Sequence, residues 1–238
     1  MIARLAALDD AAVSPTAKLL NEPDEATRVA AVLALGQMRA IAAGRALMTA
    51  LPDASADVRV AAATHLGARH GPALHAELLH LAESGPRDAA TAAVYALQKS
   101  ADPRAGPALV TLLGTAGSGA VRGQAAESLG LRREPGAFEP LLARLADAEV
   151  CRGPLLNEYR GLAIGRSAAR RAGLAPGDDR PDGPGAVRVC DVAATALVRL
   201  TGRDCGVASA ELPRDADRLR ACWRQAGMQP ASATADPP

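Results

Sequence analysis

Histidine is the residue type in this sequence with the clearest potential for metal or acid–base chemistry. The four histidines are spaced by five residues and are His65, His70, His75 and His80. Helical metal sites place their ligands three or four residues apart, because such positions share one face. Five residues turn a helix by about 500°, so neighbouring histidines diverge by roughly 140°. We therefore predict exposed or helix-flanking histidines and no metal site, the one alternative being His65 and His70 meeting across a turn.

The cysteines and one glycine-rich run are the other patterns with possible chemistry. The run at 114–119 lacks the Gly-Lys-Ser/Thr ending of a phosphate loop and follows a predicted helix, so we interpret it as an inter-helix turn. Cys151, Cys190, Cys205 and Cys222 form no Cys-x-x-Cys pair, and none adjoins a histidine. This spacing predicts neither a zinc site nor a disulfide framework, and it is typical of inert thiols in a reducing cytosol. We predict no catalytic residue and no cofactor.

The strongest pattern is an internal repeat that must position any site. Similar ten-residue stretches occur at 27–36, 58–67 and 121–130, with a more divergent copy at 89–98. Their leucines, Leu35, Leu66, Leu97 and Leu129, are 31, 31 and 32 residues apart. A period in this range indicates stacked helical units.

Each unit reads as two helices joined by a short turn. The first helix carries leucines four residues apart, namely Leu47 and Leu51, Leu109 and Leu113, and Leu141 and Leu145, with Leu78, Leu79 and Ala82 in the equivalent place. The second helix carries a buried series of Ala31, Leu35, Ala62, Leu66, Ala93, Leu97, Ala125 and Leu129. We expect Gly36, Gly67 and Gly130 to follow these helices as C-caps. The prediction is an all-α fold, an α-solenoid of antiparallel helical hairpins with a period of about 31 residues.

These units resemble HEAT repeats, in particular the short bacterial kind also described as phycobilisome-lyase-type repeats. HEAT units commonly carry an acid in the inter-helix turn and a base six residues later. Asp53 with Arg59 fits this pattern, and Glu22 with Arg28 fits it loosely. The pairs that depart from it are Ser84/Ala90 and Ala116/Arg122. The resemblance covers about residues 14–148 and implies an interaction scaffold.

The resemblance also includes enzymes and enzyme-accessory proteins. Deoxyhypusine hydroxylases hold two irons with adjacent His-Glu pairs, whereas this sequence has no His-Glu dipeptide and comes nearest with His75-Ala-Glu77. Bilin lyases attach or detach a chromophore, and no residue here marks a bilin site. A bilin-lyase-like or hydroxylase-related role is therefore the alternative function.

The chain divides into four parts. Residues 1–148 are predicted to hold the repeats, with an N-terminal cap and a helix beginning at Ser14-Pro15. Residues 149–186 are predicted to contain a helix and a long loop rich in Gly, Pro and Asp. Residues 187–227 are predicted to form capping helices, in which Trp223 covers the end of the stack. Residues 228–238 are predicted to be a disordered tail.

Arginines are the candidate partner-binding residues. Arg28, Arg59 and Arg122 are expected to be exposed early in second helices, and a basic group follows in the 149–186 part, comprising Arg160, Arg166, Arg170 and Arg171. This group predicts contact with an anionic patch on a protein partner, unless Glu158 and nearby loop acids merely neutralise a solvated face.

Net charge and composition narrow the class of partner. The net charge of +1 and the scarcity of aromatic residues argue against a nucleic-acid-binding solenoid. The chain shows no signal-peptide pattern and no apolar run of the roughly 18 residues that span a bilayer, so we expect no membrane partner and a cytoplasmic location. The predicted function is a non-catalytic protein–protein interaction scaffold, with its oligomeric state left open.

Overall fold

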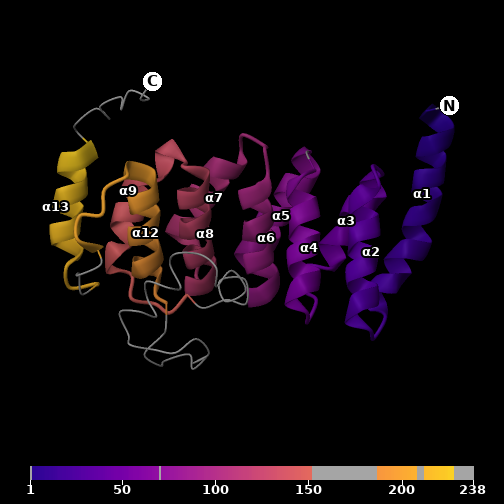
Figure 1. Cartoon of the computed structure of the whole chain (residues 1–238), viewed down its shortest axis with the longest axis horizontal. Coiled ribbons are helices and arrows are strands. Elements are labelled where there is room, and N and C mark those ends of the chain that lie inside the picture. Colours follow the sequence, from indigo (N-terminus) through magenta and orange to yellow (C-terminus); the bar gives the residue numbers. More distant parts are fainter. Residues whose placement is uncertain (1, 70, 152–186, 208–211, 228–238) are drawn as a thin grey trace, which may run out of the picture.

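The protein folds as a row of helical hairpins that runs from one end of the molecule to the other. The computed structural model describes residues 2–69, 71–151, 187–207 and 212–227. Figure 1 shows the row beginning at α1 in indigo and ending at α13 in yellow. The predicted α-solenoid is therefore confirmed.

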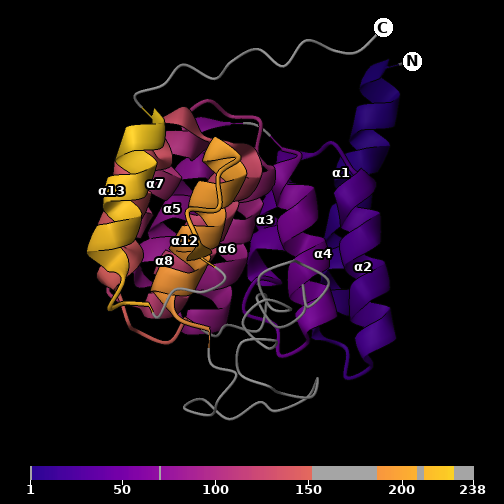
Figure 2. The ribbon, with the colours of Figure 1, turned by 60° about the vertical axis from the view of Figure 1, so that its left-hand side comes forward.

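Helices alternate between two layers, which Figure 2 shows from the side. The first helices of the hairpins are α1 (Ile2–Lys18), α3 (Ile41–Thr49), α5 (Pro72–Ser84), α7 (Ala105–Thr115) and α9 (Phe138–Ala143). The second helices are α2 (Glu25–Gln37), α4 (Ala56–Gly67), α6 (Arg87–Lys99), α8 (Gly119–Arg132) and α12 (Val189–Thr201). Each second helix packs on the next in this order, so α2, α4, α6, α8 and α12 form one continuous row. A last helix, α13 (Ala216–Gly227), closes the stack.

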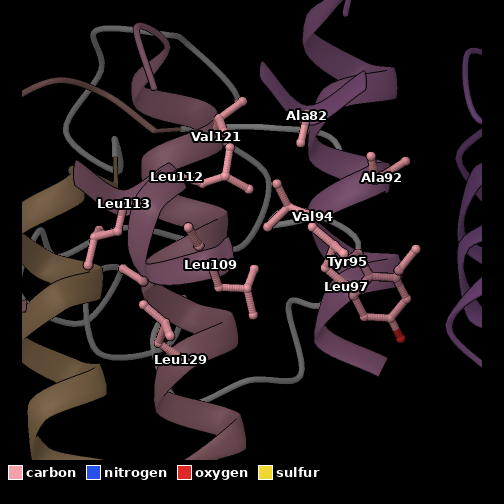
Figure 3. Packing of buried hydrophobic residues seen from close by; sticks show 14 of the residues in the cluster. Ala82, Ala92, Val94, Tyr95, Leu97, Leu109, Leu112, Leu113, Val121 and Leu129 are labelled. Atoms are coloured by element: carbon pink, nitrogen blue, oxygen red, sulfur yellow. The ribbon is translucent and has the colours of Figure 1, made fainter. Parts of the chain in front are cut away.

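The core is made of the leucines and alanines that the repeat pattern marks. Leu35, Leu66, Leu97 and Leu129 of the second helices are fully buried, as are Leu47 and Leu109 of the first helices. Figure 3 shows Leu109 and Leu112 of α7 on the side that faces Val94 and Leu97 of α6. Burying one such side chain contributes about 2 kcal/mol, and the cluster extends through every hairpin. The predicted core positions are confirmed except Leu79, which is only partly buried.

The repeat glycines lie inside the second helices, so their predicted role as C-caps is wrong. A Cβ atom added at Gly130 would lie 2.7 Å from the Cα of Ala196 in α12, and one at Gly67 would lie 2.8 Å from the carbonyl oxygen of Ala96 in α6. Such distances leave no room for a side chain. The glycines are therefore needed where one second helix approaches the next, and their periodicity reports packing between repeats.

The N-terminal hairpin begins differently from the prediction. One helix, α1, runs through Pro15, where the sequence predicts a new helix starting at Ser14. Thr16, next to the proline, donates from its hydroxyl to the Ala12 carbonyl at 2.8 Å. Proline removes one backbone donor and usually ends a helix. Here the helix continues through it, so the sequence signal for a helix start is overridden.

The last hairpin, α9 with α12, receives a long insertion in its turn. The two ends of the insertion meet in an antiparallel bridge between Val150 and Arg188. The N–H of Cys151 donates to Val187 at 2.9 Å, and the N–H of Val189 donates to Glu149 at 3.0 Å. The predicted helix and loop within 149–186, and the tail at 228–238, lie outside the described residues.

The C-terminal cap contains a disulfide that the sequence analysis excluded. α12 ends at Gly202, whose φ of 72° is left-handed, and the fully buried Trp223 of α13 donates from Nε1 to the Arg203 carbonyl at 3.0 Å. This return of the chain brings Cys205 and Cys222 together in a disulfide. The prediction of no disulfide is wrong, and the cysteine spacing gives no support for a reducing compartment.

No helix in the described ranges is long and apolar enough to cross a membrane.

Candidate binding surface along the second helices

Arg28, Arg59 and Arg122 hold the turns of their own hairpins. Each occupies the fourth position of a second helix, so each guanidinium points back at the turn before it. Nη1 of Arg28 donates to the carbonyls six and five residues earlier at 3.0 and 2.9 Å, Nη1 of Arg59 does so at 2.7 and 2.9 Å, and Nη1 of Arg122 does so at 2.8 and 3.1 Å. In three repeats, an arginine therefore bonds turn carbonyls that would otherwise need a water molecule as their hydrogen-bond donor.

Two of these arginines also reach the next repeat. Arg28 donates from Nε and Nη2 to the carboxylate of Asp53 at 2.9 and 3.0 Å. Arg122 makes the same contact with Asp147 at 2.8 and 3.2 Å, and Nη2 also donates to Glu149 at 2.6 Å. Each arginine therefore links the turns of two successive hairpins.

The expected exposure of these three arginines is wrong. Arg59 is only 2% exposed, with a carboxylate oxygen of Asp88 at 3.9 Å, and the other two are largely buried by their ion pairs. The acid–base pattern of the sequence places Asp53 with Arg59 in one repeat, whereas the carboxylate faces Arg28 of the preceding repeat. A role of these residues in partner binding stays a prediction.

The acids of this ladder are held in their charged form. Burial by itself raises the pKa of Asp53 and of Asp147, but hydrogen bonds from an arginine and from a backbone N–H outweigh it. The net result is a pKa below the usual aspartate range for both residues. The turns are therefore joined by ionised pairs at neutral pH.

A second set of arginines ties the opposite ends of the second helices. Arg69 donates to the carbonyl of Leu35 in the preceding hairpin at 2.9 Å and to that of Ala40, just before α3, at 3.2 Å. Arg132 does the same to Gln98 and Ser100 at 2.9 and 2.6 Å. Both arginines stand two residues after a repeat glycine, and both bond carbonyls at or just beyond the end of the preceding second helix.

The histidines and the two free cysteines are spread over different parts of the fold. His65 lies on α4, where burial and then Arg69 lower its pKa, whereas His75 and His80 lie on α5 and His70 falls outside the described residues. Within the described part of the chain, no group of three or more His, Cys, Asp or Glu is placed to hold a metal ion. Cys151 and Cys190 are buried free thiols, and burial raises the pKa of Cys190 to about 12.

One cavity lies between the second helices α6 and α8. It has a volume of about 470 Å³, and its lining residues are Tyr95, Gln98, Lys99, Gln124, Glu127, Leu131 and Arg132. Gln124 and Glu127, one helical turn apart on α8, are each 2% exposed. Gln124 Oε1 and Glu127 Oε1 have no hydrogen-bond donor. Buried polar atoms normally have a partner, so these two acceptors set this cavity apart.

Sequence reasoning missed these polar residues, although the repeat itself carries a signal. Five residues before the repeat leucine, the other hairpins have Ala30, Ala61 and Ala92 where α8 has Gln124. One residue after that leucine, α6 has Gln98 in the position of the glycines. A glutamine in place of alanine or glycine at a packed repeat position is the sequence signal that points to the cavity.

A second cavity is lined by residues of the first three hairpins. Its volume is about 540 Å³, and α2, α3, α4 and α5 contribute its walls. Ile41, at the start of α3, lies on its rim with 82% exposure, and Met38 and Leu74 are half-buried beside it. Arg45 is an exposed basic residue on the same wall. This surface therefore combines an exposed apolar side chain, Ile41, with the nearby positive charge of Arg45.

The predicted basic group Arg160, Arg166, Arg170 and Arg171 lies outside the described residues. Its role in partner binding stays a prediction.

The stacked hairpins define the protein as an α-solenoid built from helical repeats. Two overlapping regions, 44–130 and 75–154, match the family model of HEAT repeats. The chain is therefore a HEAT repeat domain-containing protein, as its repeat pattern predicts. A search of the curated proteins finds no match to the chain.

Proposed function

We propose that the protein is a non-catalytic scaffold that binds a protein partner. HEAT repeats generally mediate protein interactions, which supports this class of function. A continuous core and two sets of arginine links between hairpins favour a stiff surface, and a stiff surface loses little entropy on binding.

The observation that carries the proposal is the cavity beside Ile41. An aliphatic side chain that is 82% exposed at the rim of a cavity of about 540 Å³ is unfavourable in water and favourable against an apolar partner side chain. Arg45 on the same wall would attract a carboxylate of that partner. We therefore propose a partner segment with an apolar side chain flanked by an acidic one.

The proposal also retains the basic group at 160–171. Charge reversal of Arg166, Arg170 and Arg171 should weaken binding of an acidic partner surface if these residues contact it. Unchanged affinity of the triple variant would remove the group from the contact surface and leave the cavity beside Ile41 as the proposed site.

The test is affinity purification of the tagged protein from its own host, followed by mass spectrometry. A partner in stoichiometric amount should be retained by the wild-type protein and lost with Ile41→Glu. Leu19→Glu is the matched control, because Leu19 is also an exposed aliphatic residue but does not line the cavity. Recovery of a pigment, a metal or nucleic acid without a protein would overturn the scaffold proposal, and absorbance after mixing with bilin tests the lyase-like alternative directly.

A further inference from the structure

The cavity between α6 and α8 contains polar residues that the repeat fold does not require. Gln124 replaces the alanine of three other repeats, and Gln98 replaces the glycine of three others. Glu127 stands where the first two repeats have Leu33 and Thr64. These changes converge on one cavity, so they concern that cavity and not the stacking of helices in general.

The acceptors in this cavity are costly to the folded protein as they stand. A buried polar atom without a hydrogen bond destabilises the folded state, and Gln124 Oε1 and Glu127 Oε1 both lack a donor. Arg199 Nη1 lies 3.8 Å from Glu127 Oε1, which is too far for a hydrogen bond. A ligand that supplies N–H donors would satisfy both oxygens.

Two basic residues also line the cavity, Lys99 at the end of α6 and Arg132 at the end of α8. The ammonium of Lys99 is exposed and lies 5.2 Å from the centre of the Tyr95 ring, so it stays beside the mouth. Arg132 Nε is buried and has no acceptor, although Nη1 of the same residue bonds two backbone carbonyls. Lys99 and Arg132 would attract an anionic oxygen.

Together these groups define a ligand with two ends. We propose that the cavity binds an α-carboxylate with a neighbouring N–H donor, the carboxylate at Lys99 and Arg132 and the donor at Gln124 and Glu127. A volume of about 470 Å³ falls in the range of small-ligand sites. Two sources share this chemistry, a free amino acid and the C-terminal residue of a peptide, and only the second rests on the proposed scaffold function.

Equilibrium dialysis of the full chain tests the proposal. The probes are an equimolar pool of the twenty amino acids, a tripeptide library with free C-termini, and the same library with amidated C-termini, all quantified by mass spectrometry. Enrichment of amino acids alone identifies the free source, and enrichment of free-acid tripeptides identifies the peptide source. No enrichment, or equal enrichment of the amidated library, overturns the proposal. Neither result bears on the cavity beside Ile41, so the scaffold proposal stands or falls separately.

Two variants distinguish a binding role from a structural one. Gln124→Met keeps the volume and removes the unbonded oxygen, so the Tm should stay the same or rise while binding weakens about tenfold. Lys99→Met should weaken binding without loss of folding, because Lys99 is exposed. Thr64→Ala, at the position equivalent to Glu127 in the second hairpin, should leave binding unchanged. A lower Tm with undiminished binding in Gln124→Met would assign that residue to the fold and overturn the site.

Discussion

Arg28 and Asp53 form a two-point ion pair between successive hairpins, with Nε to Oδ2 at 2.9 Å and Nη2 to Oδ1 at 3.0 Å. The remaining nitrogen of the same guanidinium bonds two carbonyls of the turn before α2. All three nitrogens of this side chain are therefore bonded within the fold. Arg122 repeats this arrangement with Asp147, so it is a structural device of the solenoid.

The first prediction concerns the planar shape of this arginine. Lysine keeps the charge but cannot bond the carboxylate at two points and the turn carbonyls at once, so Arg28→Lys should lower the free energy of unfolding by about 1–3 kcal/mol. Urea denaturation followed by circular dichroism measures the change. Arg45→Lys is the control, because Arg45 is exposed, and it should stay within about 0.5 kcal/mol of wild type. Equal effects of the two substitutions would contradict the structural role of Arg28.

The sequence predicts the repeats and their core because both depend on local periodicity. Leu35, Leu66 and Leu97 recur with the helical hairpin, and each is buried. The ion-pair partner of Arg28 does not follow from local periodicity, because it depends on how one hairpin stacks on the next. The repeat pattern pairs Asp53 with Arg59, but the Asp53 carboxylate bonds Arg28 of the preceding hairpin, so sequence distance pairs the wrong residues.

The disulfide and the cavity were missed for related reasons. Cys205 and Cys222 meet only because the chain turns back after α12, and no spacing rule marks such a pair. Gln124 departs from the alanine of the other repeats, but the burial of Gln124 and Glu127 beside a cavity is visible only once α6 lies beside α8. In both cases long-range packing supplies the information.

The second prediction concerns the thiol count. Denaturation without reductant should expose Cys151 and Cys190 to iodoacetamide and leave Cys205 and Cys222 unmodified, as mass spectrometry of the peptides would show. Four modified cysteines in protein purified without reductant would contradict the disulfide.

The third prediction concerns the stabilising effect of that disulfide. The bond closes a loop of 17 residues in sequence, for which chain entropy gives about 3 kcal/mol. The double variant Cys205→Ala with Cys222→Ala should therefore loosen α13, and Trp223 fluorescence should report the loss at lower urea than in wild type. Cys190→Ala is the control for loss of a buried thiol, and a matching shift in that variant would assign the effect to packing instead.

The fourth prediction compares two glycines in neighbouring helices. Gly130→Ala places a methyl group 2.7 Å from the Cα of Ala196, which is backbone and cannot move aside without shifting α12. We expect a loss of about 1–3 kcal/mol in the free energy of unfolding. Gly114→Ala, in α7, meets no atom within 4 Å and should be neutral or stabilise the helix by up to about 1 kcal/mol. A destabilised Gly114→Ala with an unaffected Gly130→Ala would reverse the packing argument.

The fifth prediction concerns opposite pH dependences of two carboxylates. The pKa of Asp53 is lowered in the fold, because the hydrogen bonds from Arg28 and the backbone outweigh burial. Its contribution to stability is present above the unfolded aspartate pKa of about 3.9 and is lost as the pH falls through the folded value. Asp53→Asn should therefore be less stable than wild type at pH 7, and the difference should shrink toward pH 3.

The contribution of Glu127 to stability should depend on pH in the opposite direction. Burial raises its pKa, and the attraction of Arg199 only partly offsets this. The folded protein resists ionisation of this group, so stability falls as the pH rises above the unfolded glutamate pKa of about 4.3 and on to the folded value. Glu127→Gln should match wild type near pH 4 and exceed its stability at pH 7, as urea denaturation at the two pH values would show. A Glu127→Gln variant that is less stable than wild type at pH 7 would mean that the ion pair with Arg199 outweighs the cost of burial. The carboxylate would then belong to the fold, which would weaken the case for the cavity as a ligand site.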